Sequence, residues 1–579
     1  MTERYSAADT TLSERFPMYT RANVGEVFPD PVTPLTSTGA LWLAELGWRD
    51  AWERMGAFDQ GEFPAEEFCQ LGVVGGYCYL NASLIRIFGE RAPGLSAQVM
   101  DEQFFGAMPG IDPYEPQPGD EDLAKTAAIG ETFGWVLAQT SLDDLDELTA
   151  DRRSTEALRD ARPDLASLST EELYERYQQR LPEHRVLFGH HIFTTYMATV
   201  PVGIISGVAA AVGRPDLVMP IIAGIGDVDS AAPSHTMWDM GRLVAASDEL
   251  TALFDAGVGG VLDGVAASSS PDASAFGEAF AAFVHEFGSR GPNEWESRSP
   301  TWETRPELAL SAIDRMRLAP DAAAPAAQHA QRASAREAAS AELLAMVEAD
   351  PETHGQLAAA IASSVAWLPA RERSKTNNIR LIHEMRMPMR ELGRRMVDAG
   401  AFDEIEDFGF VTDAEYPAFL ADPSTVSIET IRQRRDEYAE LATRRAEFVF
   451  VGQASPPSTW PLVGDDTADK LAAGDTLQGM PGCDGVAEGR ARVVLDSNDP
   501  SALEPGDILV APITDPSWTP LFVPSAAVVV DVGAPLSHAI IVSRELGIPC
   551  VVSATDATRR IPDGAMIRVD GGTGVVTVL

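Results

Sequence analysis

The chain has 579 residues, enough for two to four domains that each bury a core of their own. With 87 acidic and 44 basic residues its formal net charge is −43, so it lacks the cationic surface that nucleic acids and anionic membranes require. Four cysteines without metal-ligand spacing and a polar N-terminus predict reduced thiols in a cytoplasmic protein without a signal peptide.

The first 451 residues are predicted to be mainly helical. Helical patterns cover 40–55 and 63–88, and an amphipathic pattern covers 171–189, where Pro182 predicts a break or a kink. The longest apolar stretch, 196–213, is interrupted by a proline and three glycines, so it predicts a buried helix rather than a membrane span.

Histidines and a Gly-rich loop follow in this helical region. His190 and His191 are adjacent, so on a helix they point in different directions and do not form a metal pair; a structural role is favoured. A helix predicted over 276–287 ends in the sequence GSRGPNEW. Arg290 and Glu294 of this loop form either a salt bridge or part of a binding site, and the sequence leaves both readings open.

Basic side chains recur on one face of a helix predicted over 365–399, which Pro388 is expected to kink. This face carries His383, Arg386, Arg390 and Arg394. Arg371 and Lys375 are four residues apart and also share a face. Such stripes are usually solvated or paired with acids, but this segment holds one of only three lysines in the chain.

The chain changes character after residue 451. Residues 452–479 are rich in Pro, Gly, Ser and Asp and predict a flexible linker. Val-rich segments predict strands at 491–495, 508–511, 526–531, 550–553, 566–570 and 575–579. The predicted fold class is therefore multidomain: a large, mainly α-helical domain (1–451), the linker, and a small C-terminal β/α domain (480–579).

One helix of this β/α domain carries a histidine at its start. Ser537 is a good N-cap residue, and Gly547 is a typical C-terminal stop. His538 then falls in the first turn, where unpaired N–H groups and the helix dipole favour negative charge. A histidine there is well placed to carry a phosphoryl group, and an incidental surface histidine is the alternative.

The surrounding stretch VVDVGAPLSHAIIVSRELGIPCVV at 529–552 resembles the phosphohistidine signature of the PEP-utilising enzyme family. The resemblance includes GCDGVAEG at 482–489 and TDPSWTP at 514–520. Segments FPDPVTPLT near the N-terminus and RERSK at 371–375 are similar to the substrate-binding domain of the rifampin phosphotransferases in this family.

This resemblance implies a swivelling domain whose His538 carries phosphate between two sites. Arg371 and Lys375 would clamp the transferring phosphoryl group, and Glu372 would orient them or the acceptor hydroxyl. Residues expected to bind the substrate are Arg290, Glu294, Arg386 and Arg390. Ser289 stands where these relatives often have histidine, so an acid–base role of that histidine would be missing here.

No phosphate-binding GxxxxGK[ST] loop and no complete dinucleotide fingerprint occur in the sequence. The substrate-domain resemblance begins within the first 40 residues, so we expect no ATP-grasp domain in this chain. We therefore expect the chain itself to bind no cofactor, and ATP with Mg²⁺ to be bound by an ATP-grasp-type partner chain.

Together these implications predict a phosphotransferase component. His538 would accept a phosphoryl group from the partner and pass it to a hydroxyl of a small molecule, with elimination of the phosphate, a net dehydration, as a variant. The alternative is a non-catalytic small-molecule-binding or regulatory protein whose phosphohistidine domain is a relic.

Overall fold

The computed structural model describes residues 5–105, 111–226, 228–321, 324–463, 469–495, 503–514, 518–533 and 537–579. Residues 515–517 and 534–536 of the predicted signature segments lie outside this part of the chain. The chain forms two compact units, each built from three segments. The N-terminal unit comprises Met1–Val200, Trp295–Ser299 and Arg373–Asp465, and the C-terminal unit comprises Pro201–Glu294, Pro300–Glu372 and Asp466–Leu579.

The N-terminal unit is mainly helical, with one antiparallel sheet of strand order β2-β3-β1-β4. Its strands are β1 (Met18–Thr20), β2 (Leu71–Val74), β3 (Tyr77–Asn81) and β4 (Val449–Val451). Its helices are α1 (Val24–Val27), α2 (Leu41–Met55), α3 (Ala82–Arg91), α4 (Ala97–Phe105), α5 (Leu123–Ala138), α6 (Asp146–Asp160), α7 (Thr170–Met197), α17 (Tyr416–Ala421) and α18 (Ile428–Ala442). The long helix α16 (Pro351–Asp398) contributes its second half here and its first half to the C-terminal unit.

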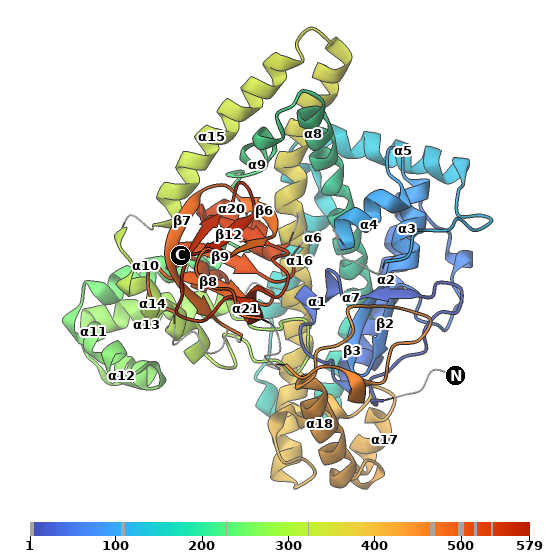
Figure 1. Cartoon of the computed structure of the whole chain (residues 1–579). Coiled ribbons are helices and arrows are strands. Elements are labelled where there is room, and N and C mark those ends of the chain that lie inside the picture. The colour runs from blue at the N-terminus through green and yellow to red at the C-terminus, as the bar shows by residue number, and fades with distance from the viewer. Residues whose placement is uncertain are drawn as a thin grey trace. The chain divides into compact units, whose positions relative to one another are not determined.

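The C-terminal unit combines helices with an eight-stranded sheet, coloured orange to red in Figure 1. Its helices are α8 (Thr199–Ala211), α9 (Val218–Ile221), α10 (Ala232–Ala245), α11 (Asp248–Asp255), α12 (Val261–Ala267), α13 (Pro271–Phe287), α14 (Glu307–Leu318), α15 (Pro325–Met346), α19 (Thr519–Phe522), α20 (His538–Leu546) and α21 (Ala557–Arg560). Its strands are β5 (Thr476–Gln478), β6 (Met480–Cys483), β7 (Val486–Val493), β8 (Ile508–Ala511), β9 (Ala527–Val530), β10 (Cys550–Val552), β11 (Met566–Asp570) and β12 (Val575–Val578).

The sheet of the C-terminal unit has the order β5-β12-β11-β7-β8-β9-β10-β6, with β7 to β10 parallel. Both faces of β8, β9 and β10 are buried, as βα connections require. Leu509 and Val528 pack into the cluster that includes α20, whereas Ile508 and Val529 pack against α21 on the other face. The cluster on the α20 side also contains apolar residues of α10, α13 and α14.

The predicted fold class is confirmed: a large, mainly helical region precedes a small C-terminal β/α domain. Each of the six strands predicted there is present, and the helix predicted over 538–546 is α20. The compact units divide the chain differently from the boundaries predicted at 451 and 480, because 201–294 and 300–372 pack with the C-terminal region. Those boundaries stay a prediction of which segments move together.

The helix predicted over 63–88 is wrong in its first part. A hairpin of β2 and β3 occupies 71–81, and a helix begins only at Ala82. Gly75 and Gly76 form the two-residue turn with φ of 55° and 75°, a left-handed conformation that glycine adopts without strain. Asn81 then caps α3 by accepting a hydrogen bond from the Leu84 N–H at 3.0 Å.

Two prolines that predicted helix breaks lie inside continuous helices. Pro182 lies within α7, and Pro388 lies within α16. Each proline removes one backbone hydrogen bond, but tertiary packing offsets that loss. Leu187 of α7 and Met385 and Met389 of α16 belong to one buried apolar cluster.

Residues predicted to form the linker are packed on both sides of 464–468. Trp460 is buried against the sheet of the N-terminal unit. Leu471 and Leu477 are buried in the core of the C-terminal sheet. The last division between the two units falls between these packed segments, inside the predicted linker 452–479.

By length and composition, one helical stretch in the described part of the chain is able to cross a membrane. It covers Thr170–Ala211, and half of its most apolar window is buried within the fold. A bent helix pair over 248–267 passes the same criterion only if it is counted as one span. Buried core helices share these features, so the stretch is weak evidence for a membrane span.

Acid should destabilise the N-terminal unit through His184 of α7. Burial lowers the pKa of His184 to about 4, so below pH 6.5 the unfolded chain takes up a proton that the folded chain refuses. The free energy of unfolding should therefore fall by about 3 kcal/mol between neutral pH and pH 4. Urea denaturation should show this loss in the wild type and a smaller one in His184→Gln. Equal losses in both proteins would contradict the prediction.

Candidate functional site

The helix α20 forms where the sequence predicts it, with His538 as its first residue. The preceding Ser537 has the extended φ and ψ of an N-cap residue, −66° and 157°. Its hydroxyl does not cap the helix and makes no hydrogen bond to the described residues. Gly547 ends the helix in the left-handed conformation, as predicted.

The imidazole of His538 is held between two threonine hydroxyls. Nε2 lies 3.0 Å from Oγ1 of Thr519, and Nδ1 lies 3.3 Å from Oγ1 of Thr514. The ring of Phe522 meets the imidazole edge to face at 5.9 Å between centroids. His538 is only 7% exposed, so the ring is enclosed in this conformation.

The two hydroxyls determine which hydrogen bonds the ring nitrogens of His538 make and what phosphorylation requires of the ring. A hydroxyl can donate to an unprotonated ring nitrogen or accept from a protonated one, so the two threonines suit a neutral imidazole in either tautomer. A neutral imidazole nitrogen is a nucleophile, and the start of α20 offers N–H groups to a bound anion. Phosphorylation of either nitrogen requires the ring to leave the threonine on that side.

Within the loop 288–295, Arg290 and Glu294 form a buried ion pair. Their side chains are 2% and 1% exposed, and Nε of Arg290 donates to Oε2 of Glu294 at 2.7 Å. A second bond joins Nη2 to Oε1 at 3.3 Å. Burial acts to lower the pKa of Arg290, but Glu294, and more distantly Glu372 and Asp229, raise it. Of the two readings of this pair, the salt bridge is present, and a role in substrate binding stays a prediction.

Arg371 and Glu372 belong to the same unit as this pair. Nη1 of Arg371 donates to Oε1 of Glu372 at 2.5 Å, and Glu372 is almost fully buried. The charge of Glu372 also acts on Arg290. The C-terminal unit therefore holds His538, Arg290, Glu294, Arg371 and Glu372 among the predicted site residues.

The other predicted site residues belong to the N-terminal unit. Arg386 is buried, and its guanidinium donates to the carbonyl oxygens of Glu296 and Ser297, each at 3.0 Å. Arg390 pairs with Glu406 at 2.6 Å. The basic face predicted on α16 is thus largely occupied by contacts within the unit. Lys375 is half-buried on the same helix.

The sequence did not predict the contacts that Glu296 and Trp295 make in the segment Trp295–Ser299. The carboxylate of Glu296 accepts hydrogen bonds from the hydroxyls of Thr33 and Thr36, at 2.7 and 2.8 Å. His191, expected to be structural, stacks near Trp295 at 5.7 Å and places Nδ1 3.0 Å from Oγ of Ser374. Ser374 directly precedes Lys375 on α16.

Position 289 offers a hydrogen-bonding group without a described partner. Ser289 is 7% exposed, and its Oγ makes no hydrogen bond within the described residues. A buried hydroxyl of this kind is able to bond a ligand or water. Within the same described ranges, no three His, Cys, Asp or Glu side chains are grouped as metal ligands.

Two family models match this chain. Residues 190–372 match the rifampicin phosphotransferase fourth domain, and residues 503–574 match the mobile domain of PEP-utilising enzymes. The second match contains His538, Thr514 and Thr519, and the first contains Arg290, Glu294, Arg371 and Glu372. The resemblance predicted from the sequence is confirmed.

Individual relatives agree with these matches. An uncharacterized protein of Mycobacterium tuberculosis is 35% identical over 313 residues, 53% of this chain and 32% of the relative. The rifampicin phosphotransferase of Streptomyces sviceus is 32% identical over 52% of this chain and 34% of its own length. That of Bacillus subtilis is 36% identical over 32% of this chain and 20% of its own length. The chain thus spans about a third or less of the length of these relatives.

Proposed function

We propose that this chain is a phosphotransferase component that works through phosphohistidine. His538 accepts a phosphoryl group from a nucleotide bound, with Mg²⁺, by a separate ATP-grasp-type chain in the cytoplasm. It then passes the group to a hydroxyl of a small molecule bound by the helical region. The observation that carries the proposal is the position of His538, an imidazole between two threonine hydroxyls at the start of α20, within the segment that matches the mobile domain.

The two half-reactions balance. First, a ring nitrogen of His538 forms an N–P bond while the O–P bond to the nucleotide breaks, and the nucleotide leaves with that bonding pair. Second, the acceptor oxygen forms an O–P bond while the N–P bond breaks, and the hydroxyl proton is released. Arg371 and Lys375 neutralise the phosphoryl oxygens in this second step, and Glu372 orients Arg371. A phosphate ester is the product, and elimination of its phosphate gives the dehydration variant.

The direct test is transfer of label. The chain is incubated with a purified ATP-grasp protein encoded beside it and with ATP labelled in its phosphoryl groups. The proposal predicts label on the chain that is labile to acid and stable to base. Adding hydroxyl compounds, with rifampicin as the first probe because relatives are named for it, should move the label to one of them. Absence of label with a competent partner would overturn the proposal.

The enclosure of His538 favours a second candidate function. A chain whose ring stays between Thr514 and Thr519 would bind a small molecule without phosphotransfer, and its mobile domain would be a relic. In that case no label appears with any partner, whereas hydroxyl compounds still bind. Measuring binding in parallel with labelling therefore separates the two functions.

The two threonines should reveal which nitrogen of His538 carries the phosphoryl group. When one ring nitrogen is phosphorylated, the threonine at the other nitrogen stays in place and orients the ring. Replacing that threonine by valine should therefore slow phosphorylation about tenfold. Replacing the threonine at the phosphorylated nitrogen, which the phosphoryl group displaces, should have a smaller effect on the phosphorylation rate. We therefore expect unequal labelling rates for Thr514→Val and Thr519→Val, and NMR of the phosphohistidine isomer should agree with the order. Equal rates would contradict this assignment.

A further inference from the structure

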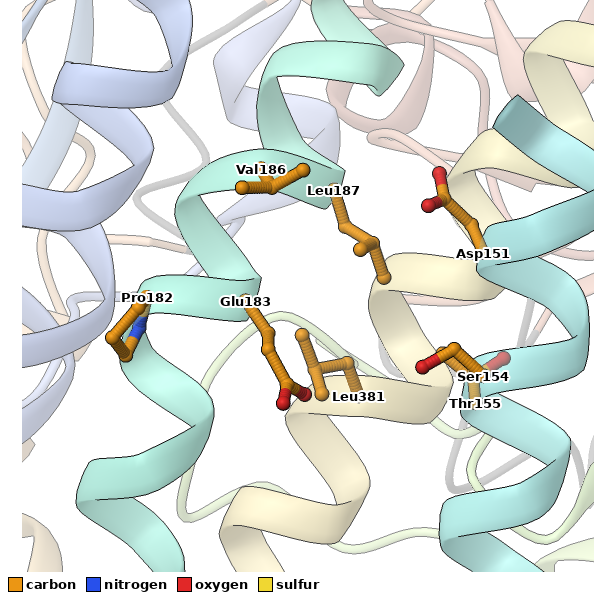
Figure 2. Close-up of a pocket in the computed structure, with 8 residues that line it drawn as sticks. All are labelled: Asp151, Ser154, Thr155, Pro182, Glu183, Val186, Leu187 and Leu381. Carbon is orange, nitrogen blue, oxygen red and sulfur yellow. The ribbon is translucent and has the colours of Figure 1, made fainter.

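A cavity of about 280 Å³ lies within the N-terminal unit, between α6, α7 and α16. Residues that line it are Asp151, Ser154, Thr155, Pro182, Glu183, Val186, Leu187 and Leu381. Figure 2 shows Ser154 on α6 and Glu183 on α7 on opposite sides of the space, with Leu187 and Leu381 between them. None of these residues belongs to the phosphohistidine site.

The lining combines apolar walls with hydrogen-bond acceptors. Its only ionisable members are the carboxylates of Asp151 and Glu183, and no lysine or arginine lines it. The Thr155 hydroxyl donates its proton to the carbonyl oxygen of Arg152 at 3.0 Å, so its oxygen can only accept a hydrogen bond from a ligand. Ser154 is the one side chain of the lining whose hydroxyl is exposed as a donor. A ligand that matches this lining must supply donors.

Both carboxylates have cationic neighbours outside the lining, yet each retains accepting capacity. Asp151 is nine-tenths buried, and its Oδ2 lies 2.7 Å from Nδ1 of His190. Its Oδ1 accepts no hydrogen bond from the part of the chain that the structure describes. Glu183 pairs with Arg180 at 2.9 Å, but its side chain is 39% exposed, and exposed pairs of this kind are weak.

From this lining we propose that the cavity binds a small organic cation, an alkyl- or arylammonium compound. Its ammonium group donates to Oδ1 of the buried Asp151, its apolar body packs against Leu187 and Leu381, and the charge of Glu183 on the facing helix attracts the cation at longer range. The volume is slightly below the range of drug-sized sites, about 300–1,000 Å³, which favours a compact ligand. A metal ion fits poorly, because among the described residues no third ligand joins the two carboxylates. This proposal does not depend on phosphotransfer.

The test uses benzylamine, which is cationic at neutral pH, and benzyl alcohol as its neutral counterpart. Saturation-transfer NMR on the full chain should show benzylamine binding, with benzyl alcohol at least about tenfold weaker because a charge-assisted hydrogen bond is lost. Ser154→Trp, an exposed substitution that fills the cavity, should abolish binding. Asp151→Asn should weaken it about tenfold, and Glu183→Gln should weaken it less.

A matched control is Glu175→Gln, which removes an exposed carboxylate from α7 two turns before Glu183 without touching the cavity. It should bind benzylamine like the wild type. Thermal melting of each variant identifies any that fail to fold. The proposal is overturned if benzylamine does not bind, if benzyl alcohol binds equally well, or if folded Ser154→Trp binds like the wild type.

Discussion

Replacement of His538 by alanine is expected to abolish phosphorylation of the chain. The only described histidine at the start of a helix in the matched mobile domain is His538, so no neighbouring imidazole there can replace it as nucleophile. Loss of a covalent nucleophile typically costs at least about a thousandfold in rate. The measurement is the acid-labile label that the chain acquires from labelled ATP and the partner protein.

A matched control for this variant is His354→Ala, which removes a half-buried histidine at the beginning of α16. It should retain full labelling. His538→Gln provides a second check, because glutamine can still bond the hydroxyls of Thr514 and Thr519 while it cannot form a stable phosphoramidate. Persistent labelling in a folded His538→Gln variant would place the phosphoryl group elsewhere.

Breaking the buried pair of Arg290 and Glu294 should have the largest effect on stability. Arg290→Ala leaves a carboxylate that is 1% exposed without its guanidinium, and Glu294→Ala leaves the guanidinium without its carboxylate. Removing one member of a buried ion pair typically costs about 3–5 kcal/mol. Chemical denaturation of the C-terminal unit should therefore show a large fall in the free energy of unfolding for either variant.

The double variant Arg290→Met/Glu294→Leu distinguishes charge from packing. Because it removes both charges, it should lose less stability than either single variant. Arg394→Ala is the surface control: this arginine is 48% exposed in its pairs with Glu391 and Asp398, so the denaturation midpoint should not change. If neither Arg290→Ala nor Glu294→Ala lowers the free energy of unfolding by more than a small amount, the pair does not stabilise the fold as predicted.

Local signals explain why much of the C-terminal domain is readable from sequence. Val-rich runs between turn residues predicted the strands β7 to β12. The side chains of β8, β9 and β10 face a buried core on both sides, whereas those of β11 and β12 alternate between the core and a more exposed face. Gly547 adopts the left-handed conformation that its place after α20 demanded. His538 was found in the same way, through its own helix and the motif around it.

Contacts between distant segments were not readable. Nothing in the spacing of 514, 519 and 538 indicates that two threonine hydroxyls will meet the ring of His538. The role of Glu296 was hidden for the same reason, because its partners Thr33 and Thr36 are more than two hundred residues away. By contrast, the hairpin at Gly75 and Gly76 was missed although its Gly-Gly signal was present, because the flanking residues also fit a helical period.

The closed setting of His538 has a consequence for the lifetime of a phosphorylated form. Phosphoramidates are lost spontaneously to water, and side chains packed around the ring keep bulk solvent away from it. Hydrolysis would then be limited by how often the chamber opens rather than by the chemistry of the bond. The half-life of the phosphoprotein, followed without acceptor, would then report how often the side chains around the ring move apart. Replacing Phe522, which packs against the imidazole, by a smaller residue should shorten that half-life.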